Sequence, residues 1–319
     1  MNVPGGKKTV LIALGGNALI RKGQAGSIEE QFENLKTPIR QIARLSQDYR
    51  VLITHGNGPQ VGNLLLLQEV QSDVPRLPLE ILVAQTQGQI GYMIESTLDT
   101  ELMALGPDAQ KPLVSLISYV VVDVNDPAFR NPSKPIGPVY EEAEVSSLPF
   151  QVVKTAKGFR RVVASPQPVT IVEKREIHAL LDMDFIVICC GGGGIPVIRE
   201  GRSFEGVDAV IDKDLASARL AEEVGVDLFV IATDVDGAAL NYGEPGQVFL
   251  ERLLPDEARR YLKEGHFPPG SMGPKIEACL SFVERSGNEA IITSIHAIDA
   301  AVAGHAGTSM RAGKSWGRS

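Results

Sequence analysis

The fold of this 319-residue chain is decided near its start, by Thr9-Val10-Leu11-Ile12-Ala13-Leu14-Gly15-Gly16-Asn17-Ala18. An almost wholly apolar run is followed at once by two glycines. Such a run is typical of a strand that is buried on both faces, as in a parallel sheet covered by helices. Residues 51–54 repeat the pattern and lead into a second glycine turn, His55-Gly56-Asn57-Gly58-Pro59-Gln60. The two stretches predict successive strand–turn–helix units of an α/β fold.

Apolar runs of this kind recur along the chain and alternate with longer amphipathic segments. Candidate strands lie at residues 9–14, 51–54, 113–122, 185–190, 228–233 and 290–294. Candidate helices lie at residues 27–48, 59–68, 81–105, 213–224 and 274–286. Ser27 and Glu30 form a capping box at the start of the first helix. The alternation predicts a three-layer αβα sandwich around a mostly parallel central sheet.

Residues 123–170 break this alternation. They contain seven of the 20 prolines and no long helical period. Long excursions from a compact domain are usually lids, binding loops or linkers, so we predict an extended β-rich or irregular excursion from the main sheet here. Residues 313–319 are polar and glycine-rich, and they are predicted to form a frayed tail.

The composition is that of an ordinary globular protein, with 44% hydrophobic and 22% charged residues. A net charge of −8 argues against a general nucleic-acid-binding or membrane-surface protein, because such proteins need a basic face. Residues 1–8 hold no apolar signal-peptide run, and cysteine is rare. We therefore expect a cytoplasmic protein with reduced, buried thiols. Cys189 and Cys190 are predicted to point to opposite faces of a strand.

The two glycine turns are candidate anion sites. Their residues are Gly15, Gly16, Asn17, Gly56, Asn57 and Gly58. Unobstructed backbone N–H groups can converge on an oxyanion, and ligands of open α/β sheets bind at the carboxyl ends of strands. Either turn alone fits equally well a tight connection that merely needs glycine, but two in succession favour a binding site. The four glycines at residues 191–194 could approach a ligand in the same way.

Two familiar nucleotide-binding motifs do not fit. Gly56, Gly58 and Gly62 give G-x-G-x-x-x-G, one residue longer than the dinucleotide spacing, which weakens a nicotinamide-dependent oxidoreductase as an alternative. Gly313-Lys314-Ser315 looks like the end of a P-loop, but Thr308 stands where its first glycine belongs.

Three lysines lie in stiff glycine- and proline-rich settings. Lys275 follows Pro274 at a predicted helix start, Lys213 also precedes a helix, and Lys134 lies between prolines of the excursion. A cation in the first turn of a helix opposes the helix dipole unless an anion lies between them. Each lysine alone is more often a solvated surface charge. Together, beside two candidate phosphate turns, they predict a site for phosphoryl transfer, which depends on positioning and charge neutralisation.

Residues 212–214 and 233–234 are further candidate positions of this phosphoryl-transfer site. Asp212 and Asp214 flank Lys213, and these carboxylates could orient its ammonium group and keep it charged. Thr233-Asp234 follows a buried strand and so lies at another carboxyl strand end, suited to nucleotide contact. An ordinary turn remains the alternative there. His55 is expected to be structural rather than catalytic.

Taken together, these motifs resemble the carbamate kinases of the amino-acid kinase superfamily. The resemblance covers residues 8–308 in blocks of matching order and spacing. The blocks are residues 13–18 (ALGGNA), 55–62 (HGNGPQVG), 87–92 (QGQIGY), 126–129 (DPAF), 134–137 (KPIG), 160–163 (RRVV), 165–168 (SPQP), 191–197 (GGGGIPV), 209–215 (AVIDKDL) and 270–275 (GSMGPK). Ala164 stands where we expect proline, which affects only local loop stiffness.

The resemblance implies an amino-acid kinase fold and reversible phosphoryl transfer between ATP and carbamate, giving ADP and carbamoyl phosphate, with Mg²⁺ carried mainly by the nucleotide phosphates. It implies one domain at residues 7–312, with a small-acid and phosphoryl lobe at 7–225, a lid at 123–170 and a nucleotide lobe at 226–312. It further implies a homodimer that runs toward ATP in arginine-type catabolism.

The resemblance also implies roles for individual residues. Lys213 and Lys275 would contact the transferring phosphoryl group, Asp214 would organise both lysines, and Lys134 would act from the lid on the small acid. The two glycine turns would bind carbamate and phosphoryl oxygens. The nucleotide site would include Thr233, Asp234, Val235, Tyr242, Met272 and Gly273.

Two alternatives share this fold. One is a kinase of a larger acid such as an acylated glutamate, which the excursion carrying Lys134 argues against. The other is a non-catalytic nucleotide sensor, which the presence of Lys213, Asp214 and Lys275 argues against.

Overall fold

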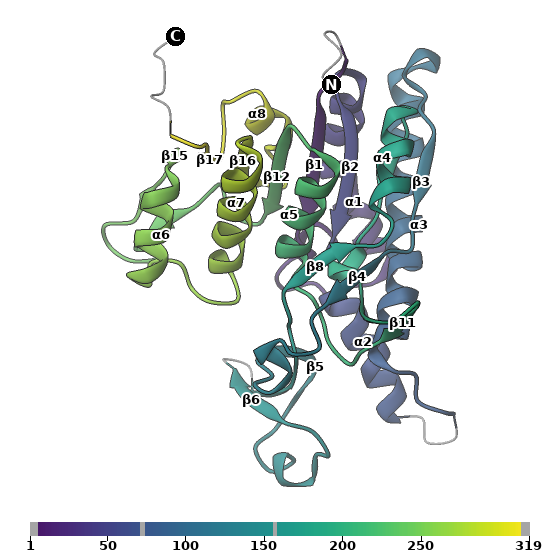
Figure 1. Cartoon of the computed structure of the whole chain (residues 1–319), viewed down its shortest axis with the longest axis vertical. Helices are drawn as coiled ribbons and strands as arrows, with labels where there is room; N and C mark the ends of the chain where they lie inside the picture. The colour runs from purple at the N-terminus through teal and green to yellow at the C-terminus, as the bar shows by residue number, and fades with distance from the viewer. Residues whose placement is uncertain (1–5, 71–73, 156–157, 314–319) are drawn as a thin grey trace.

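The computed structural model describes residues 6–70, 74–155 and 158–313. In this part of the chain an eight-stranded sheet forms the centre, and β1 lies between β12 and β2 (Figure 1). The order across the sheet is β15 (Arg252–Leu253), β17 (Thr308–Met310), β16 (Glu289–Ser294), β12 (Leu228–Thr233), β1 (Thr9–Leu14), β2 (Arg50–His55), β9 (Ile186–Ile188) and β3 (Leu113–Ser115). All neighbouring pairs are parallel except β16 and β17. The predicted mostly parallel sheet is confirmed.

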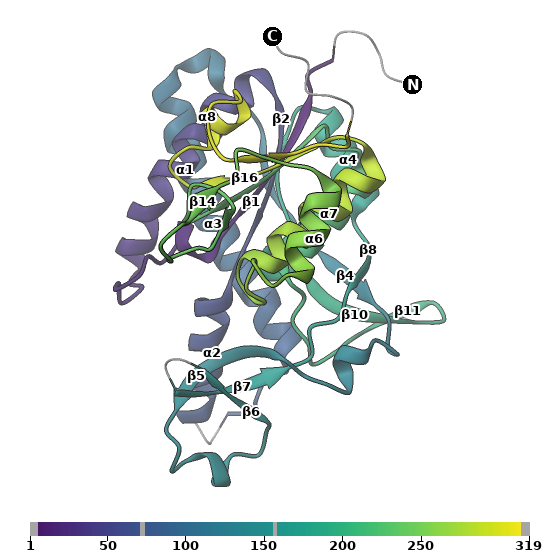
Figure 2. The same ribbon diagram turned by 90° about the vertical axis from the view of Figure 1, so that its left-hand side faces the viewer.

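Helices cover both faces of this sheet, as Figure 2 shows from the side. One face carries α1 (Ile28–Asp48), α3 (Leu79–Leu105) and α8 (Ile298–Val302), and the other carries α4 (Lys174–Asp182), α5 (Lys213–Val224) and α7 (Met272–Ser286). Val10 and Ile12 of β1 enter the first core, whereas Leu11 and Ala13 enter the second. Because alternate residues of β1 point to opposite faces, a continuous apolar run is what this three-layer arrangement requires.

The helix boundaries follow local sequence signals. Ser27 caps α1, since its Oγ accepts from the Glu30 N–H at 3.3 Å while Glu30 Oε2 accepts from the Ser27 N–H at 3.0 Å. The predicted capping box is therefore confirmed. α3 ends at Gly106, whose φ of 116° few other residues adopt. α7 begins at Met272, two residues before the predicted start at Pro274.

The prediction of one strand at residues 113–122 is wrong. The chain instead passes from β3 in the main sheet to β4 (Tyr119–Val122) in a second sheet. The strand breaks because the buried side chain of Gln87, on α3, accepts from the Ser118 N–H through Oε1 at 2.9 Å. The second sheet has the order β11 (Ser203–Gly206), β10 (Ile195–Glu200), β4 and β8 (Pro168–Ile171).

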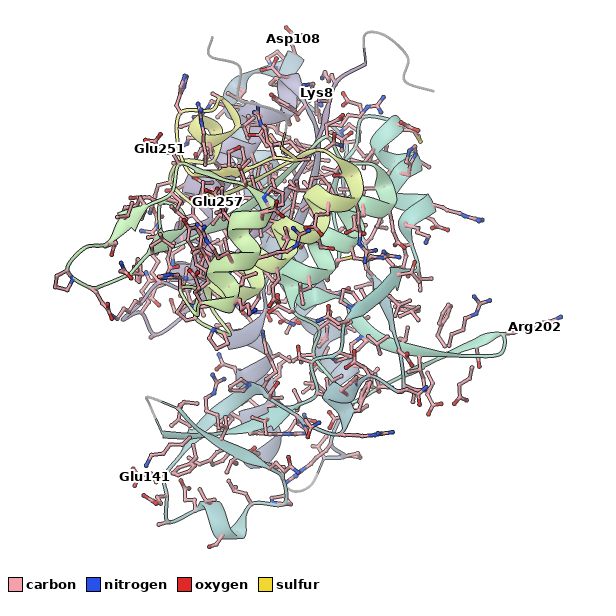
Figure 3. All side chains as sticks on the ribbon, turned by 60° about the vertical axis from the view of Figure 1, so that its left-hand side comes forward. Lys8, Asp108, Glu141, Arg202, Glu251 and Glu257 are labelled. Atoms are coloured by element: carbon pink, nitrogen blue, oxygen red, sulfur yellow. The ribbon has the colours of Figure 1, made fainter. Side chains whose placement is uncertain are left out.

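A third sheet projects beyond the carboxyl ends of the central strands (Figure 1). Its order is β5 (Lys134–Tyr140), β7 (Gly158–Val163) and β6 (Val152–Thr155), and all three strands belong to the proline-rich excursion. In Figure 3 Glu141 lies at the far end of this projection, while Arg202 marks the separate tip between β10 and β11. β5 packs on α2 (Gly58–Val70) through a small core that includes Val61, Ile136 and Val163.

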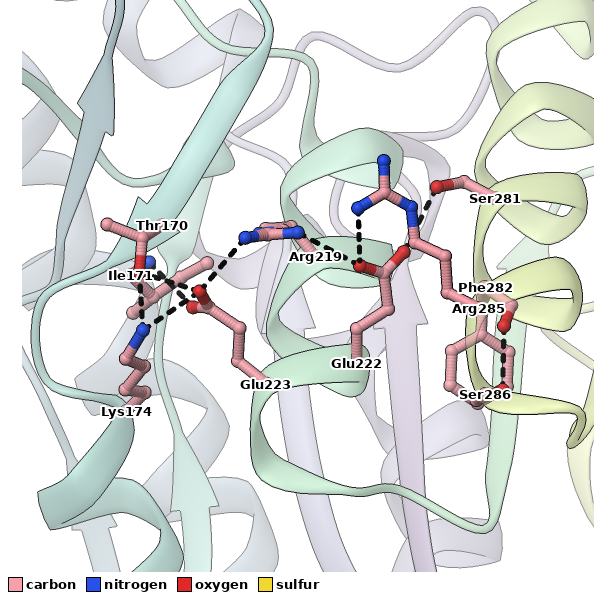
Figure 4. Close-up of polar contacts among 10 residues, drawn as sticks. All are labelled: Thr170, Ile171, Lys174, Arg219, Glu222, Glu223, Ser281, Phe282, Arg285 and Ser286. Carbon is pink, nitrogen blue, oxygen red and sulfur yellow. Dashed lines mark hydrogen bonds and ion pairs between the residues drawn. The ribbon is translucent and has the colours of Figure 1, made fainter.

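Hydrogen bonds and an ion pair brace α5 on two sides (Figure 4). Glu223 accepts from Thr170 Oγ1 at 2.6 Å and pairs with Lys174 Nζ at 3.0 Å, which fixes α5 to β8 and α4. Glu222 accepts from Ser281 Oγ at 3.0 Å, which fixes α5 to α7. The two helices whose starts carry Lys213 and Lys275 are thus held against each other.

The remaining described elements are short. They are η1 (Gly16–Ala18), η2 (Pro107–Ala109), η3 (Pro127–Phe129), η4 (Val145–Ser147), η5 (Gly191–Gly193), β13 (Ala239–Leu240), β14 (Val248–Phe249) and α6 (Pro255–Lys263). Among the described residues, none of the helices has the length and apolarity needed to cross a membrane. Of the predicted tail, residues 314–319 lie outside the described residues.

The cysteines are free and buried, as predicted. The prediction that Cys189 and Cys190 point to opposite faces of a strand is wrong, because β9 ends before them and both enter the same core beside α5. Cys190 has a left-handed φ of 49°, which interrupts the alternation of a strand. Burial raises the pKa of the Cys279 thiol, so this thiol stays protonated and unreactive.

Candidate active site

The two predicted glycine turns lie side by side, because β1 and β2 pair in parallel with Leu14 opposite His55. The Gly15 N–H donates to Ala232 O at 2.8 Å, and the Gly56 N–H donates to Leu14 O at 3.0 Å. These two N–H groups form hydrogen bonds within the central sheet, so they are not available to a ligand. The next residues open η1 at Gly16 and α2 at Gly58, where the first N–H groups have no acceptor inside the helix. The amides of these turns that stay open to a ligand therefore lie at the starts of η1 and α2.

Close packing favours glycine at Gly15, where a Cβ would lie 3.1 Å from Ala232 O. A Cβ on Gly56 would make only ordinary contacts, 3.4 Å from the Gly16 nitrogen and 3.6 Å from Lys213 Cδ. Gly192, with φ of 68°, packs against Asn57, and a Cβ there would come within 2.2 Å of Asn57 Nδ2. The glycines at residues 191–194, predicted to approach a ligand, thus also support the second turn.

A cavity of about 470 Å³ opens in front of these turns. Of the predicted residues, its lining includes Gly16, Gly56, Asn57, Gly58, Lys134 and Lys213. Gly15 and Asn17, both in the described part of the chain, flank Gly16 outside the lining. The lining also includes Asp212 and Arg160, neither of which was predicted to face this cavity.

A second cavity, of about 200 Å³, lies at the carboxyl end of β12. Its lining brings together the predicted nucleotide residues Thr233, Asp234, Val235, Tyr242 and Met272, together with Lys275. It also includes His266, Phe267 and Pro268, which the sequence did not reveal because they lie before the matching block at residues 270–275.

Gly273 does not join the lining of the second cavity in the described structure. Its N–H donates to Pro268 O at 3.0 Å, and a Cβ there would lie 3.1 Å from that oxygen. Gly273 therefore lets the loop pack closely against the start of α7.

Asp214 links the two cavities. Its Oδ1 lies 2.5 Å from Lys213 Nζ, which reaches the first cavity, and its Oδ2 lies 2.8 Å from Lys275 Nζ, which reaches the second. The Asp214 side chain is only 5% exposed, and the lysine side chains are 13% and 15% exposed. One buried carboxylate thus holds two ammonium groups at the junction of the cavities.

The charges of this trio are set by burial and by each other. Burial alone would raise the pKa of Asp214, but Lys213 and Lys275 outweigh it, so the pKa lies well below its usual range. Burial lowers the pKa of Lys213, and Asp214 only partly opposes this. For Lys275 the attraction of Asp214 outweighs burial and raises the pKa. The carboxylate is ionised at neutral pH.

Asp212 connects the projecting sheet to the start of α5. Its Oδ1 accepts from the Asp214 N–H at 2.9 Å as the helix cap, and its Oδ2 accepts from Lys134 Nζ at 2.7 Å. The cap was readable from sequence, because aspartate is favoured before a helix. The contact with Lys134 was not, since the two residues lie 78 positions apart.

His55 is buried, and its Nδ1 lies 3.1 Å from Gly56 O. Burial lowers the pKa of its imidazole to about 4, so His55 is neutral at pH 7. Within residues 6–70, 74–155 and 158–313, no three His, Cys, Asp or Glu side chains gather closely enough to hold a metal ion.

Comparison with known proteins defines the class. The model of the amino acid kinase family matches residues 8–294, and the chain belongs to this family. The carbamate kinase of Thermococcus kodakarensis is 50% identical over 94% of this chain and 98% of its own, and that of Haemophilus influenzae is 45% identical over 94% and 95%. A structure of Giardia lamblia carbamate kinase bound to AMP-PNP aligns with a TM-score of 0.89 at 39% identity, over 96% of this chain and 99% of its own. The predicted fold and family are confirmed.

Proposed function

We propose that this chain is a carbamate kinase, which transfers a phosphoryl group reversibly between ATP and carbamate to give ADP and carbamoyl phosphate. The observation that carries the proposal is the Lys213–Asp214–Lys275 bridge between two cavities. The second cavity gathers residues predicted to contact the nucleotide, and the first gathers the glycine turns and lysines predicted to contact the small acid. The two lysines therefore stand where a phosphoryl group would pass. The identity of the acid rests on the similarity to carbamate kinases.

In the direction of ATP synthesis, a terminal oxygen of ADP attacks the phosphorus of carbamoyl phosphate. The bond from phosphorus to the carbamoyl oxygen breaks, and carbamate leaves with that electron pair. Lys213 and Lys275 neutralise the phosphoryl oxygens, and Asp214 fixes their ammonium groups. The amides at the starts of η1 and α2 bind oxygens of the small acid, so the chain acts by positioning and charge stabilisation.

We propose that Mg²⁺ arrives with the nucleotide phosphates. Both oxygens of Asp214 are engaged by lysines, whereas Mg²⁺ commonly binds phosphates with few protein ligands. Asp234, which lines the second cavity, is the carboxylate best placed to contact the hydrated ion. The metal would supply further neutralisation of phosphate charge.

The purified chain should form ATP from Mg-ADP and carbamoyl phosphate, measured by a luciferase-coupled assay. ATP formation would support the proposal. A folded protein that binds ADP but forms no ATP would favour the nucleotide sensor. Turnover of an acylated glutamate with ATP, in place of carbamoyl phosphate with ADP, would favour the kinase of a larger acid.

Lys134→Ala should raise the KM for carbamoyl phosphate about 10-fold or more, by removing a charged hydrogen-bond donor from the small-acid cavity. The KM for ADP should change little, because Lys134 does not line the nucleotide cavity among the described residues. Steady-state kinetics with each substrate varied in turn give both values. Lys154→Ala, an exposed change on β6 of the same sheet, is the matched control. Equal losses for both substrates would argue against this role.

We further propose that the protein is a cytoplasmic homodimer that works in arginine catabolism toward ATP, on the strength of its resemblance to carbamate kinases. Light scattering on the purified protein tests the dimer, since one chain has a mass of 34.3 kDa. A monomeric mass at working concentrations would contradict this part of the proposal.

A further inference from the structure

Two consecutive arginines on β7 point to opposite sides of the projecting sheet. Arg161 pairs with Asp208 at 3.0 Å, and its guanidinium lies 5.2 Å from the centre of the Phe150 ring. Arg160 instead lines the cavity in front of the glycine turns, together with Lys134 from the neighbouring strand β5. The alternation of a strand therefore gives these two residues different surroundings.

The guanidinium of Arg160 is held in place by one backbone oxygen. Its Nε and Nη2 donate to Gly137 O at 3.2 and 2.9 Å. The register of β5 and β7 shifts between Ile136 and Tyr140, and this irregularity leaves the Gly137 carbonyl available to a side chain. A guanidinium has five N–H donors, so three remain after these two bonds.

Unlike the neighbouring lysines, Arg160 has no ion-pair partner among the described residues. Lys134 pairs with Asp212 and Lys213 pairs with Asp214. No carboxylate within the described ranges lies at ion-pair distance from Arg160. Burial lowers the pKa of its guanidinium, although an arginine remains charged at any ordinary pH. A partly desolvated and unpaired guanidinium gains strongly from an arriving anion.

We propose that Arg160 is a substrate-binding residue that contacts an oxygen of carbamoyl phosphate from the projecting sheet. With Lys134 it forms a pair of cations from the projecting sheet, and both line the same cavity as Gly56, Asn57 and Gly58 of the second glycine turn. This inference rests on the proposed function for the identity of the anion. The planar fork of arginine suits an oxyanion with two adjacent oxygens, whether on the phosphoryl or the carbamoyl group.

A purely structural role makes a different prediction. If Arg160 only braced Gly137 O, lysine and glutamine, which both keep a donor for that oxygen, would affect anion binding to a similar small extent. Arg160→Lys keeps the charge and one donor for Gly137 O but loses the fork. Arg160→Gln keeps a donor but loses the charge. A graded loss of anion affinity from arginine to lysine to glutamine therefore indicates substrate contact.

Arg160→Gln should raise the KM for carbamoyl phosphate about 10- to 100-fold, the usual effect of losing a hydrogen bond to a charged group. The KM for ADP should stay within about twofold, and Arg160→Lys should fall between the wild type and Arg160→Gln. Arg161→Gln, the matched control on the same strand, should leave the KM for carbamoyl phosphate near that of the wild type. An unchanged KM in Arg160→Gln, or an equal rise in Arg161→Gln, would overturn the proposal.

A second measurement separates this inference from the proposed function. Inorganic phosphate should raise the Tm of the wild-type protein, because it binds the folded cavity, and should raise that of Arg160→Gln much less. This readout needs no turnover. If the wild type formed no ATP but phosphate still discriminated the two proteins, the proposed function would fail and the anion contact would stand. Equal phosphate shifts in both proteins would refute the contact.

Discussion

Replacing Lys213 or Lys275 by alanine should lower kcat about 10²- to 10³-fold while the protein remains folded, by analogy with the loss of one oxyanion donor. Each ammonium group reaches one of the two cavities and is fixed by Asp214, at 2.5 Å for Lys213 and 2.8 Å for Lys275. Because their position is set before substrate binds, most of their contribution should appear in the transition state. The loss should therefore fall on kcat more than on KM.

The measurement is ATP formation under saturating Mg-ADP and carbamoyl phosphate, with circular dichroism to show that the fold persists. Lys263→Ala, at an exposed position in α6, is a control that removes a lysine elsewhere in the C-terminal part of the chain. Near-normal kcat in either variant would remove that lysine from the catalytic set. The wild type should also lose activity at alkaline pH, as Lys213, with its pKa below the usual lysine value, gives up its proton.

The sequence predicted the central sheet well because the apolar pattern of a buried strand depends only on the residues of that strand. A strand buried on both faces must be apolar over most of its length, and the inner residues of β1, β2 and β12 follow this rule. The prediction failed at residues 113–122, where the chain leaves one sheet for another. That break depends on Gln87, which is far away in sequence and reaches Ser118 only after α3 has packed. Apolar periodicity carries no signal of such a contact.

For the candidate site, too, some features could be predicted from the sequence and others could not. Glycine after a strand and lysine at a helix start could be read directly, and the structure gathers these residues around two cavities. The ion-pair partners of the charged side chains could not be predicted from the sequence. Lys134 meets Asp212 across 78 positions, and Arg160 meets no carboxylate in the described residues although Arg161 beside it does. Which charged side chain forms an ion pair, and with which partner, depends on tertiary packing.

Replacing Asp214 by asparagine should reduce the free energy of unfolding by about 3–5 kcal/mol at pH 7, because it leaves two buried ammonium groups without their shared carboxylate. The change is nearly isosteric, and the amide oxygen of the new side chain would still accept a hydrogen bond, so little of the loss would come from packing. Turnover should fall as well, since Lys213 and Lys275 would repel each other and move apart. Urea denaturation gives the stability, and Asp208→Asn, an exposed carboxylate paired with Arg161, is the control.

The pH dependence of the stability lost in Asp214→Asn shows whether the loss comes from the charge of Asp214. The pKa of Asp214 is depressed in the folded protein, so its contribution is complete above about pH 4, the unfolded value, and disappears as pH falls through the folded value. The wild type and Asp214→Asn should therefore converge in strongly acidic solution. They should also approach each other at alkaline pH, because lysines with depressed pKa values in the variant lose protons and stability rises with pH. A stability difference that is the same at every pH would show that Asp214 acts through packing rather than through its charge.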